Sequence, residues 1–181
     1  MKTEIFDLIK SFEGIIGALL GTLMTLIVTH ILRKTGKVTS NIVKTNFEYL
    51  NYRTGFGEPV NTVVEADHAS IEITVDFFNN SESYKSINDI VIILCDNSDN
   101  EIHKIIPKDI ETRRSGSHSV YYDDLEYINI GPNELIKKGL RFGFNTGDIE
   151  LLKNTDYFKL IYSVHKRSAK SKKVITKIIN F

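Results

Sequence analysis

The chain has 181 residues, which is enough for one ordinary domain and a membrane segment. Its 23 basic and 23 acidic side chains balance, and the part after residue 37 carries a net charge of −2. A near-neutral domain lacks the broad positive field that nucleic-acid binding needs, so we expect no nucleic-acid partner. The single cysteine, Cys95, excludes an internal disulfide framework. The abundance of Ile, Lys and Asn is typical of AT-rich bacterial or phage genomes.

Residues 15–32 form an apolar run without Asp, Glu, Lys or Arg. Since about 20 helical residues cross the hydrocarbon core of a bilayer, the run predicts a single-pass transmembrane helix over residues 14–32. Apolar side chains recur on one side of residues 1–13, which favours either an interfacial turn or the start of the same helix. The lipid bilayer is therefore the first predicted partner.

Two alternatives to a retained span remain. A cleaved signal peptide has a basic leader and a small-residue cleavage site, whereas here Glu4, Asp7 and Glu13 lie in the leader and no such site follows. A buried core helix conflicts with three glycines, which destabilise a helix in water.

Four basic residues follow the span, Arg33, Lys34, Lys37 and Lys44, against Lys2, Lys10 and the terminal amine before it. The positive-inside rule thus favours a cytoplasmic C-terminal domain, and the extracellular orientation remains open.

Glycines recur on nearly one face of the predicted span, at Gly14, Gly17 and Gly21. The last two form a GxxxG motif, whose small residues let two helix backbones approach closely in lipid. The motif predicts a homodimer through this face, and the alternative is that glycine is simply common in membrane helices.

After a basic connector at 33–41, the hydrophobic period changes to two, which indicates strands. In residues 42–52 we expect Val43, Thr45, Phe47 and Tyr49 on one face, and residues 69–78 place Ala69, Ile71, Ile73, Val75 and Phe77 inward. Residues 89–95 are apolar on both faces, as in a central strand, and form a hairpin with 101–106. Further strands are expected at 119–130, 140–145, 157–165 and 173–180, with Tyr157 facing outward and Phe158 inward. Short helices are expected at 107–112 or 148–153.

This spacing of short strands and turns predicts that residues 42–181 form an antiparallel β-sandwich of about seven to nine strands, immunoglobulin-like or fibronectin-like. The chain lacks the Cys…Trp…Cys pattern of antibody domains, so an antibody-type domain is not supported.

A long polar segment around residue 115 is the first candidate binding site. Basic and aromatic side chains gather there, at Arg113, Arg114, His118, Tyr121 and Tyr122. Long loops on a sandwich often carry binding residues, and Arg and Tyr suit recognition of a protein. The alternative is a solvated loop.

A second candidate surface is basic and lies between the last two predicted strands, at Lys166, Arg167, Lys170, Lys172 and Lys173. Each such side chain near an anionic membrane surface contributes about 1 kcal/mol to binding. The alternative is a sheet edge kept soluble by lysine.

No motif indicates a metal or a cofactor, and we expect neither. Asp96–Asn100 has residue types that suit calcium, but they equally suit a tight turn, which we favour. In the apolar strand, Cys95 is expected to be a buried hydrophobe. An enzyme assembled from scattered residues such as His118, Asp123 and Asp124 is the alternative from another class.

The sequence therefore predicts a membrane-anchored, non-enzymatic β-sandwich that acts as a binding or scaffolding subunit for a protein partner. A surface-exposed factor of the phage exclusion or adhesion type is the alternative if the domain lies outside the cell.

Overall fold

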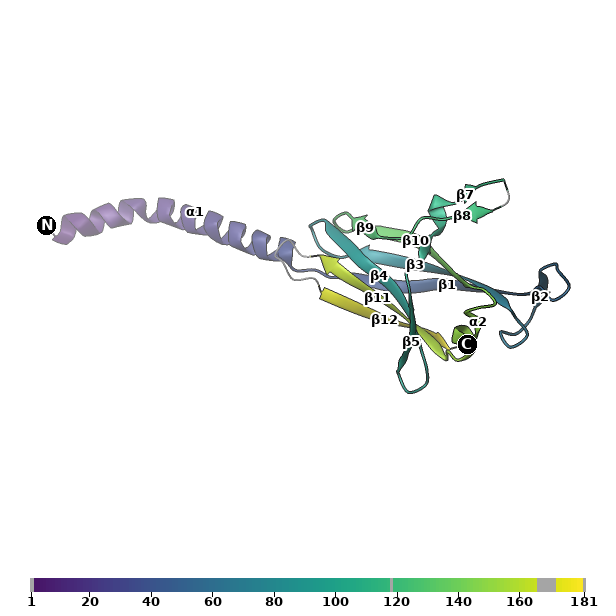
Figure 1. The fold of residues 1–181 in the computed structure, drawn as a ribbon. Coiled ribbons are helices and arrows are strands. Elements are labelled where there is room, and N and C mark those ends of the chain that lie inside the picture. The colour runs from purple at the N-terminus through teal and green to yellow at the C-terminus, as the bar shows by residue number, and fades with distance from the viewer. Residues whose placement is uncertain (1, 118, 166–171, 181) are drawn as a thin grey trace.

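The computed structural model describes the backbone of residues 2–117, 119–165 and 172–180, and the side chains of residues 12–31, 35–117 and 119–165. A long helix leaves one end of a two-layered β domain and extends away from it, roughly along the direction of the strands (Figure 1). We call this end of the domain the helix end and the opposite end the far end.

The helices are α1 (Lys2–Lys34) and α2 (Ile149–Lys153), with a 3-10 turn, η1, at Ile110–Thr112. The strands are β1 (Val38–Asn51), β2 (Glu58–Val60), β3 (His68–Asn79), β4 (Lys85–Cys95), β5 (Glu101–Ile105), β6 (Lys108–Asp109), β7 (Arg114–Ser115), β8 (Val120–Tyr121), β9 (Tyr127–Ile130), β10 (Leu135–Phe144), β11 (Tyr157–His165) and β12 (Lys172–Asn180). Eight of these strands have four residues or more, as expected for a sandwich.

Two antiparallel sheets form the domain. One has the order β2-β1-β3-β10-β6, and the other has the order β12-β11-β4-β5, with β9 paired to the first part of β4. A separate two-stranded ribbon joins β7 to β8. These sheets confirm the predicted antiparallel sandwich and the predicted hairpin of β4 with β5.

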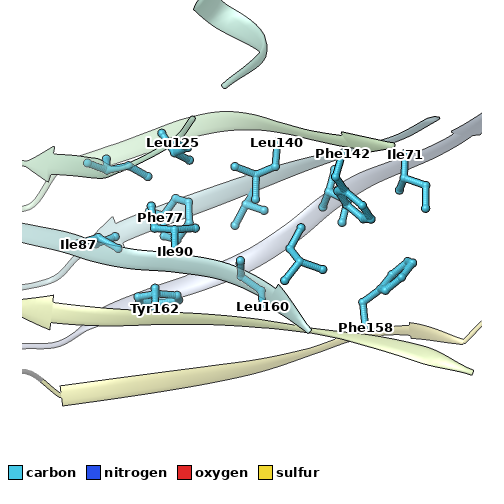
Figure 2. Packing of buried hydrophobic residues seen from close by; sticks show 14 of the residues in the cluster. Ile71, Phe77, Ile87, Ile90, Leu125, Leu140, Phe142, Phe158, Leu160 and Tyr162 are labelled. Carbon is cyan, nitrogen blue, oxygen red and sulfur yellow. The ribbon is translucent and has the colours of Figure 1, made fainter. Parts of the chain in front are cut away.

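The core lies between the two sheets (Figure 2). From β3, alternate side chains point inward as predicted, and Ile71, Ile73 and Phe77 are fully buried. Edge-to-face aromatic pairs link the sheets, with ring centroids 5.4 Å apart in both Phe77–Tyr162 and Phe142–Phe158. Buried side chains of this size each contribute about 1.5–3 kcal/mol by leaving water.

Bulges change which side chains face the core. On β1 the pairing with β3 skips one residue, Val43, between Ile42 and Lys44. The prediction that Val43 shares the inward face of Phe47 and Tyr49 is therefore wrong, and its side chain is exposed. An extra residue in one strand reverses the alternation beyond it.

A second, smaller cluster lies on the other face of β4 and β11. It contains Val91, Ile93 and Cys95 from β4 with Tyr157 and Ile161 from β11. Tyr157, predicted to face outward, is buried here because β4 presents apolar side chains on both faces. Cys95 is buried as expected, and burial raises the pKa of its thiol despite the nearby Lys159 ammonium.

Other differences concern the ends of elements. β1 begins at Val38 and β10 at Leu135, earlier than the predicted strands at 42 and 140. The predicted strand at 119–130 is divided into β8 and β9. Both η1 and α2 fall in the segments where short helices were expected.

We predict that Ile73→Ala lowers the free energy of unfolding by about 2–5 kcal/mol, because it removes buried methylene and methyl groups and leaves a cavity. The matched control is Ile106→Ala, whose side chain is 54% exposed. We expect the control to change stability by less than about 0.5 kcal/mol. Urea unfolding of the full chain in detergent measures both, and equal midpoints would contradict the assigned core.

Candidate functional site

The ribbon of β7 and β8 projects from the sandwich (Figure 1). Arg114 pairs with Tyr121, and Ser115 pairs with Val120. We call the described residues 113–117 and 119–122 the finger. Its outer surface carries Arg113 and Arg114 with the exposed side chains of Val120 and Tyr121. His118, another predicted binding residue, lies outside the described residues.

Hydrogen bonds and an ion pair hold the base of the finger. Arg114 forms an ion pair with Asp123 across the ribbon. The backbone N–H of Asp123 donates to Thr112 Oγ1 at 2.8 Å, and the N–H of Asp109 donates to the Asp123 carbonyl at 2.9 Å. These contacts join Asp123 to β6 and to η1, and residues 114–115 and 120–121 of the predicted long loop form a ribbon.

Tyr122 faces away from the exposed Tyr121. Its ring lies 5.3 Å from the Arg141 guanidinium, a cation–π distance. Arg141 also forms an ion pair with Glu72 at 2.5 Å. The structure therefore separates the two tyrosines, with Tyr122 packed at the base and Tyr121 exposed to solvent.

Further ion pairs surround the base. Lys108 pairs with Asp124 at 2.6 Å, and Lys138 pairs with Asp109 at 3.2 Å and with Glu111. Burial alone lowers the pKa of Lys138, but these two carboxylates outweigh it and raise that pKa. The two carboxylates of the enzyme alternative, Asp123 and Asp124, are thus both engaged by cations.

The junction between α1 and the sandwich is a network of polar groups. Asn79 is fully buried, and its Nδ2 donates to the carbonyls of Ser83 at 2.8 Å and Gly131 at 2.7 Å. Its Oδ1 accepts from the N–H of Ser81 at 3.1 Å and from the Ser81 hydroxyl at 2.6 Å. Because backbone groups supply both donors and acceptors, the amide orientation is fixed. Asn79 joins the β3–β4 loop to the β9–β10 turn.

The link from α1 to β1 has three residues and is attached to the same loop. The N–H of Lys37 donates to Asn80 Oδ1 at 2.5 Å, and the N–H of Asn80 donates to the Lys37 carbonyl at 3.2 Å. Gly36 has a φ of +142°, and a Cβ at this position would collide with Ser81. Glycine is therefore required for the helix to leave the domain at this angle.

Helix α1 contains a stretch, Phe12–Ile31, that is long and apolar enough to cross a membrane, and the domain covers none of it. A Cβ added at Gly14, Gly17 or Gly21 would meet nothing within 4 Å, so their face of the helix is open. The hydroxyl of Thr25 donates to the carbonyl of Gly21 at 2.8 Å, which satisfies this polar group within the helix.

The far end displays side chains that the sequence patterns did not single out. Phe56, between β1 and β2, is 81% exposed, and Val64 is exposed in the next loop. The Tyr52 ring lies 4.6 Å from the His68 ring, and the N–H of Tyr52 donates to Asp67 at 2.9 Å. A hydrogen bond from His68 and this N–H lower the pKa of Asp67.

The remaining candidates are a metal site, the turn at Asp96 and the basic surface between β11 and β12. Among the residues that the structure describes, no group of three His, Cys, Asp or Glu could hold a metal ion. Asp96 Oδ1 accepts from the N–H groups of Ser98 and Asn100, both at 2.9 Å, as in the predicted turn. Of the basic surface, Lys166, Arg167 and Lys170 lie outside the described residues. Lys172 and Lys173 begin β12, opposite Val164 and Ser163, and their side chains are not described.

Together these features define an immunoglobulin-like β-sandwich with an apolar N-terminal helix. The model of the YopI Ig-like domain family matches residues 36–177, and the chain belongs to this family. The match begins at Gly36, within the link between α1 and β1.

A relative from Bacillus subtilis (strain 168), the SPbeta prophage-derived uncharacterized protein YopI, is 34% identical over 135 residues, which cover 74% of this chain and 76% of the relative. Among solved structures, the putative ApaA protein of Bordetella pertussis is 9% identical with a TM-score of 0.39, covering 82% of this chain and 93% of that one. An uncharacterized β-sandwich protein of Clostridium difficile 630 is 18% identical with a TM-score of 0.32, covering 78% of this chain and 85% of that one.

We predict that Asn79→Asp lowers the free energy of unfolding by about 3 kcal/mol or more, because it removes the buried donor and turns a carboxylate toward two carbonyls. Asn80→Asp is the matched control: Asn80 is exposed, and its Oδ1 only accepts from Lys37, which a carboxylate also does. We expect the control to shift stability by less than about 0.5 kcal/mol. Urea unfolding of the full chain in detergent compares them, and equal effects would contradict the role of Asn79.

Proposed function

We propose that this chain is a membrane-anchored, non-enzymatic β-sandwich protein that uses its finger to bind a protein partner at the membrane surface. The observation that carries the proposal is an exposed Tyr121 directly opposite Arg114 in a two-stranded ribbon, with the exposed Arg113 next to Arg114 in sequence. Tyr and Arg are enriched among residues that dominate binding energy at protein interfaces. Because ion pairs already order the ribbon, binding would cost little conformational entropy.

Two further features support the proposal. The apolar stretch of α1 is uncovered by the domain, which is the arrangement a bilayer anchor needs. The carboxylates of Asp123 and Asp124 form ion pairs at the base of the finger, which favours a structural role over a catalytic one.

The finger is tested by Tyr121→Ser, which we expect to weaken partner binding by about tenfold or more, the effect of losing a central interface tyrosine. Tyr127→Ser is the matched control, because Tyr127 is 62% exposed on β9 and Tyr121 is 61% exposed. Quantitative mass spectrometry of proteins that co-purify with the tagged chain from detergent extracts measures the effect. If both variants retain or lose the same proteins equally, the finger is not the binding surface.

We also propose that two copies associate through the face of Gly14, Gly17 and Gly21. Gly17→Leu with Gly21→Leu is expected to abolish dimers, because leucine side chains prevent the helix backbones from approaching. Leu19→Ile with Leu23→Ile alters the span without adding bulk and should leave dimers intact. Energy transfer between labelled chains in vesicles reports the result, and unchanged transfer in the glycine variant would contradict this interface.

The orientation that we propose places the sandwich in the cytoplasm, since the basic residues flanking the span favour that side. We expect protease added to intact cells to leave the domain uncut and to digest it after the membrane is permeabilised.

The prophage origin of the B. subtilis relative favours a second candidate, an anchored surface factor of the phage exclusion or adhesion type. Digestion in intact cells would support this second candidate and reverse our orientation.

A further inference from the structure

Exposed apolar side chains gather at the helix end of the sandwich. Phe78 on β3 and Leu135 on β10 are register partners on neighbouring strands, and their side chains are 37% and 56% exposed. Tyr84, in the β3–β4 loop, is 79% exposed. It lies beside the β9–β10 turn, because a Cβ at Gly131 would be 3.7 Å from its ring. We call Phe78, Tyr84 and Leu135 the basal patch.

The junction holds the basal patch at a short distance from the end of the apolar stretch. That stretch ends at Ile31, α1 ends at Lys34, and β1 begins at Val38. Three helical residues rise about 4.5 Å, and a three-residue link spans at most about 10 Å. The loop that carries Tyr84 is hydrogen-bonded to that link through Asn80 and Lys37. The start of β1 therefore lies within about 15 Å of the end of the apolar stretch, on the link to which the loop of Tyr84 is bonded. The headgroup region of a bilayer is about 5–7 Å thick, so this end of the domain lies next to it when α1 spans the membrane.

We infer that the basal patch rests on the phospholipid headgroup layer and that Tyr84 and Leu135 contact lipid. This inference depends on the proposed membrane anchor. Tyrosine is enriched at membrane–water interfaces because its ring is apolar and its hydroxyl can remain hydrated.

The charges around the basal patch suit a headgroup layer that contains both phosphate and ammonium groups. Lys37 and Lys137 are exposed at this end. Two exposed acidic residues, Glu82 and Glu134, also lie here, and the Glu134 carboxylate accepts the N–H of Gly131 within the domain. Lysines near an anionic surface add to the attraction. The sandwich is thus seated on the membrane and does not stand clear of it on a stalk.

The absence of tryptophan from the chain allows a direct test. Tyr84→Trp and Phe56→Trp each introduce a single fluorophore at an exposed position, one in the basal patch and one at the far end. Each full-length variant is reconstituted into vesicles of phosphatidylcholine and phosphatidylglycerol that carry a nitroxide in the headgroup region. We expect the tryptophan at position 84 to lose about half of its emission, as an interfacial side chain would. Emission from position 56 should not change. Leu135→Trp is a second probe of the basal patch and should behave like Tyr84→Trp.

Flotation of the same vesicles distinguishes failure of the inference from failure of the anchor. If the chain floats with the vesicles but positions 84 and 135 are unquenched and accessible to acrylamide, the domain stands clear of lipid and the inference is wrong. If acrylamide does not reach positions 84 and 135 and the nitroxide lipid does not quench them either, a protein surface such as a second copy covers the basal patch. This result also contradicts the inference. A chain that does not float contradicts the proposed anchor itself.

Discussion

Face-to-face burial of two sheets is the constraint on which the rest of this structure depends. β3 and β10 from one sheet and β4 and β11 from the other enclose a continuous apolar core. The aromatic pairs Phe77–Tyr162 and Phe142–Phe158 cross between the layers and restrict their relative position. The ends of these strands form the junction and the far end, and the finger is attached through β6 to the middle of β10. Each exposed surface is therefore positioned by side chains that no partner would touch.

The junction adds a second constraint, which is polar. Asn79 is buried among backbone carbonyls and N–H groups, and its hydrogen bonds connect the end of β3 and the β3–β4 loop to the β9–β10 turn. A buried amide with satisfied hydrogen-bonding groups specifies one local arrangement, since any displacement leaves a polar group unpaired. With Gly36 and the Lys37–Asn80 pair, this network gives the helix a defined direction from the domain.

Sequence periodicity was sufficient to predict the strands that have one face, or both faces, buried along their whole length. The alternation of Ile71, Ile73 and Phe77 predicted β3, and the uninterrupted apolar run predicted that both faces of β4 are buried. The bulge at Val43 was not predictable in this way, because it depends on the pairing of β1 with β3. The burial of Tyr157 likewise depends on which strand lies beside β11.

For the candidate site, composition drew attention to the segment of the finger but did not predict its ribbon form. Arg114 and Tyr121 belong to strands of two residues, which are too short for periodicity to reveal. The separation of Tyr121 from Tyr122 follows from the position of Arg141, which is distant in sequence. Asn79 had the composition of a loop residue, and only the approach of the β9–β10 turn makes it a buried connector.

The bulge at Val43 also affects how neighbouring molecules can meet. Within the described pairings, β1 joins β2 only through Tyr49–Asn51, so much of its outer edge has no strand partner. Proteins confined to a membrane diffuse in two dimensions with similar orientation, and their unpaired strand edges would meet repeatedly at the same height. A bulge interrupts the regular spacing of N–H and C=O groups and twists the edge, which opposes growth of a continuous sheet from one molecule to the next. If the proposed anchor confines these chains to a membrane, the irregularity in β1 would oppose their polymerisation along strand edges.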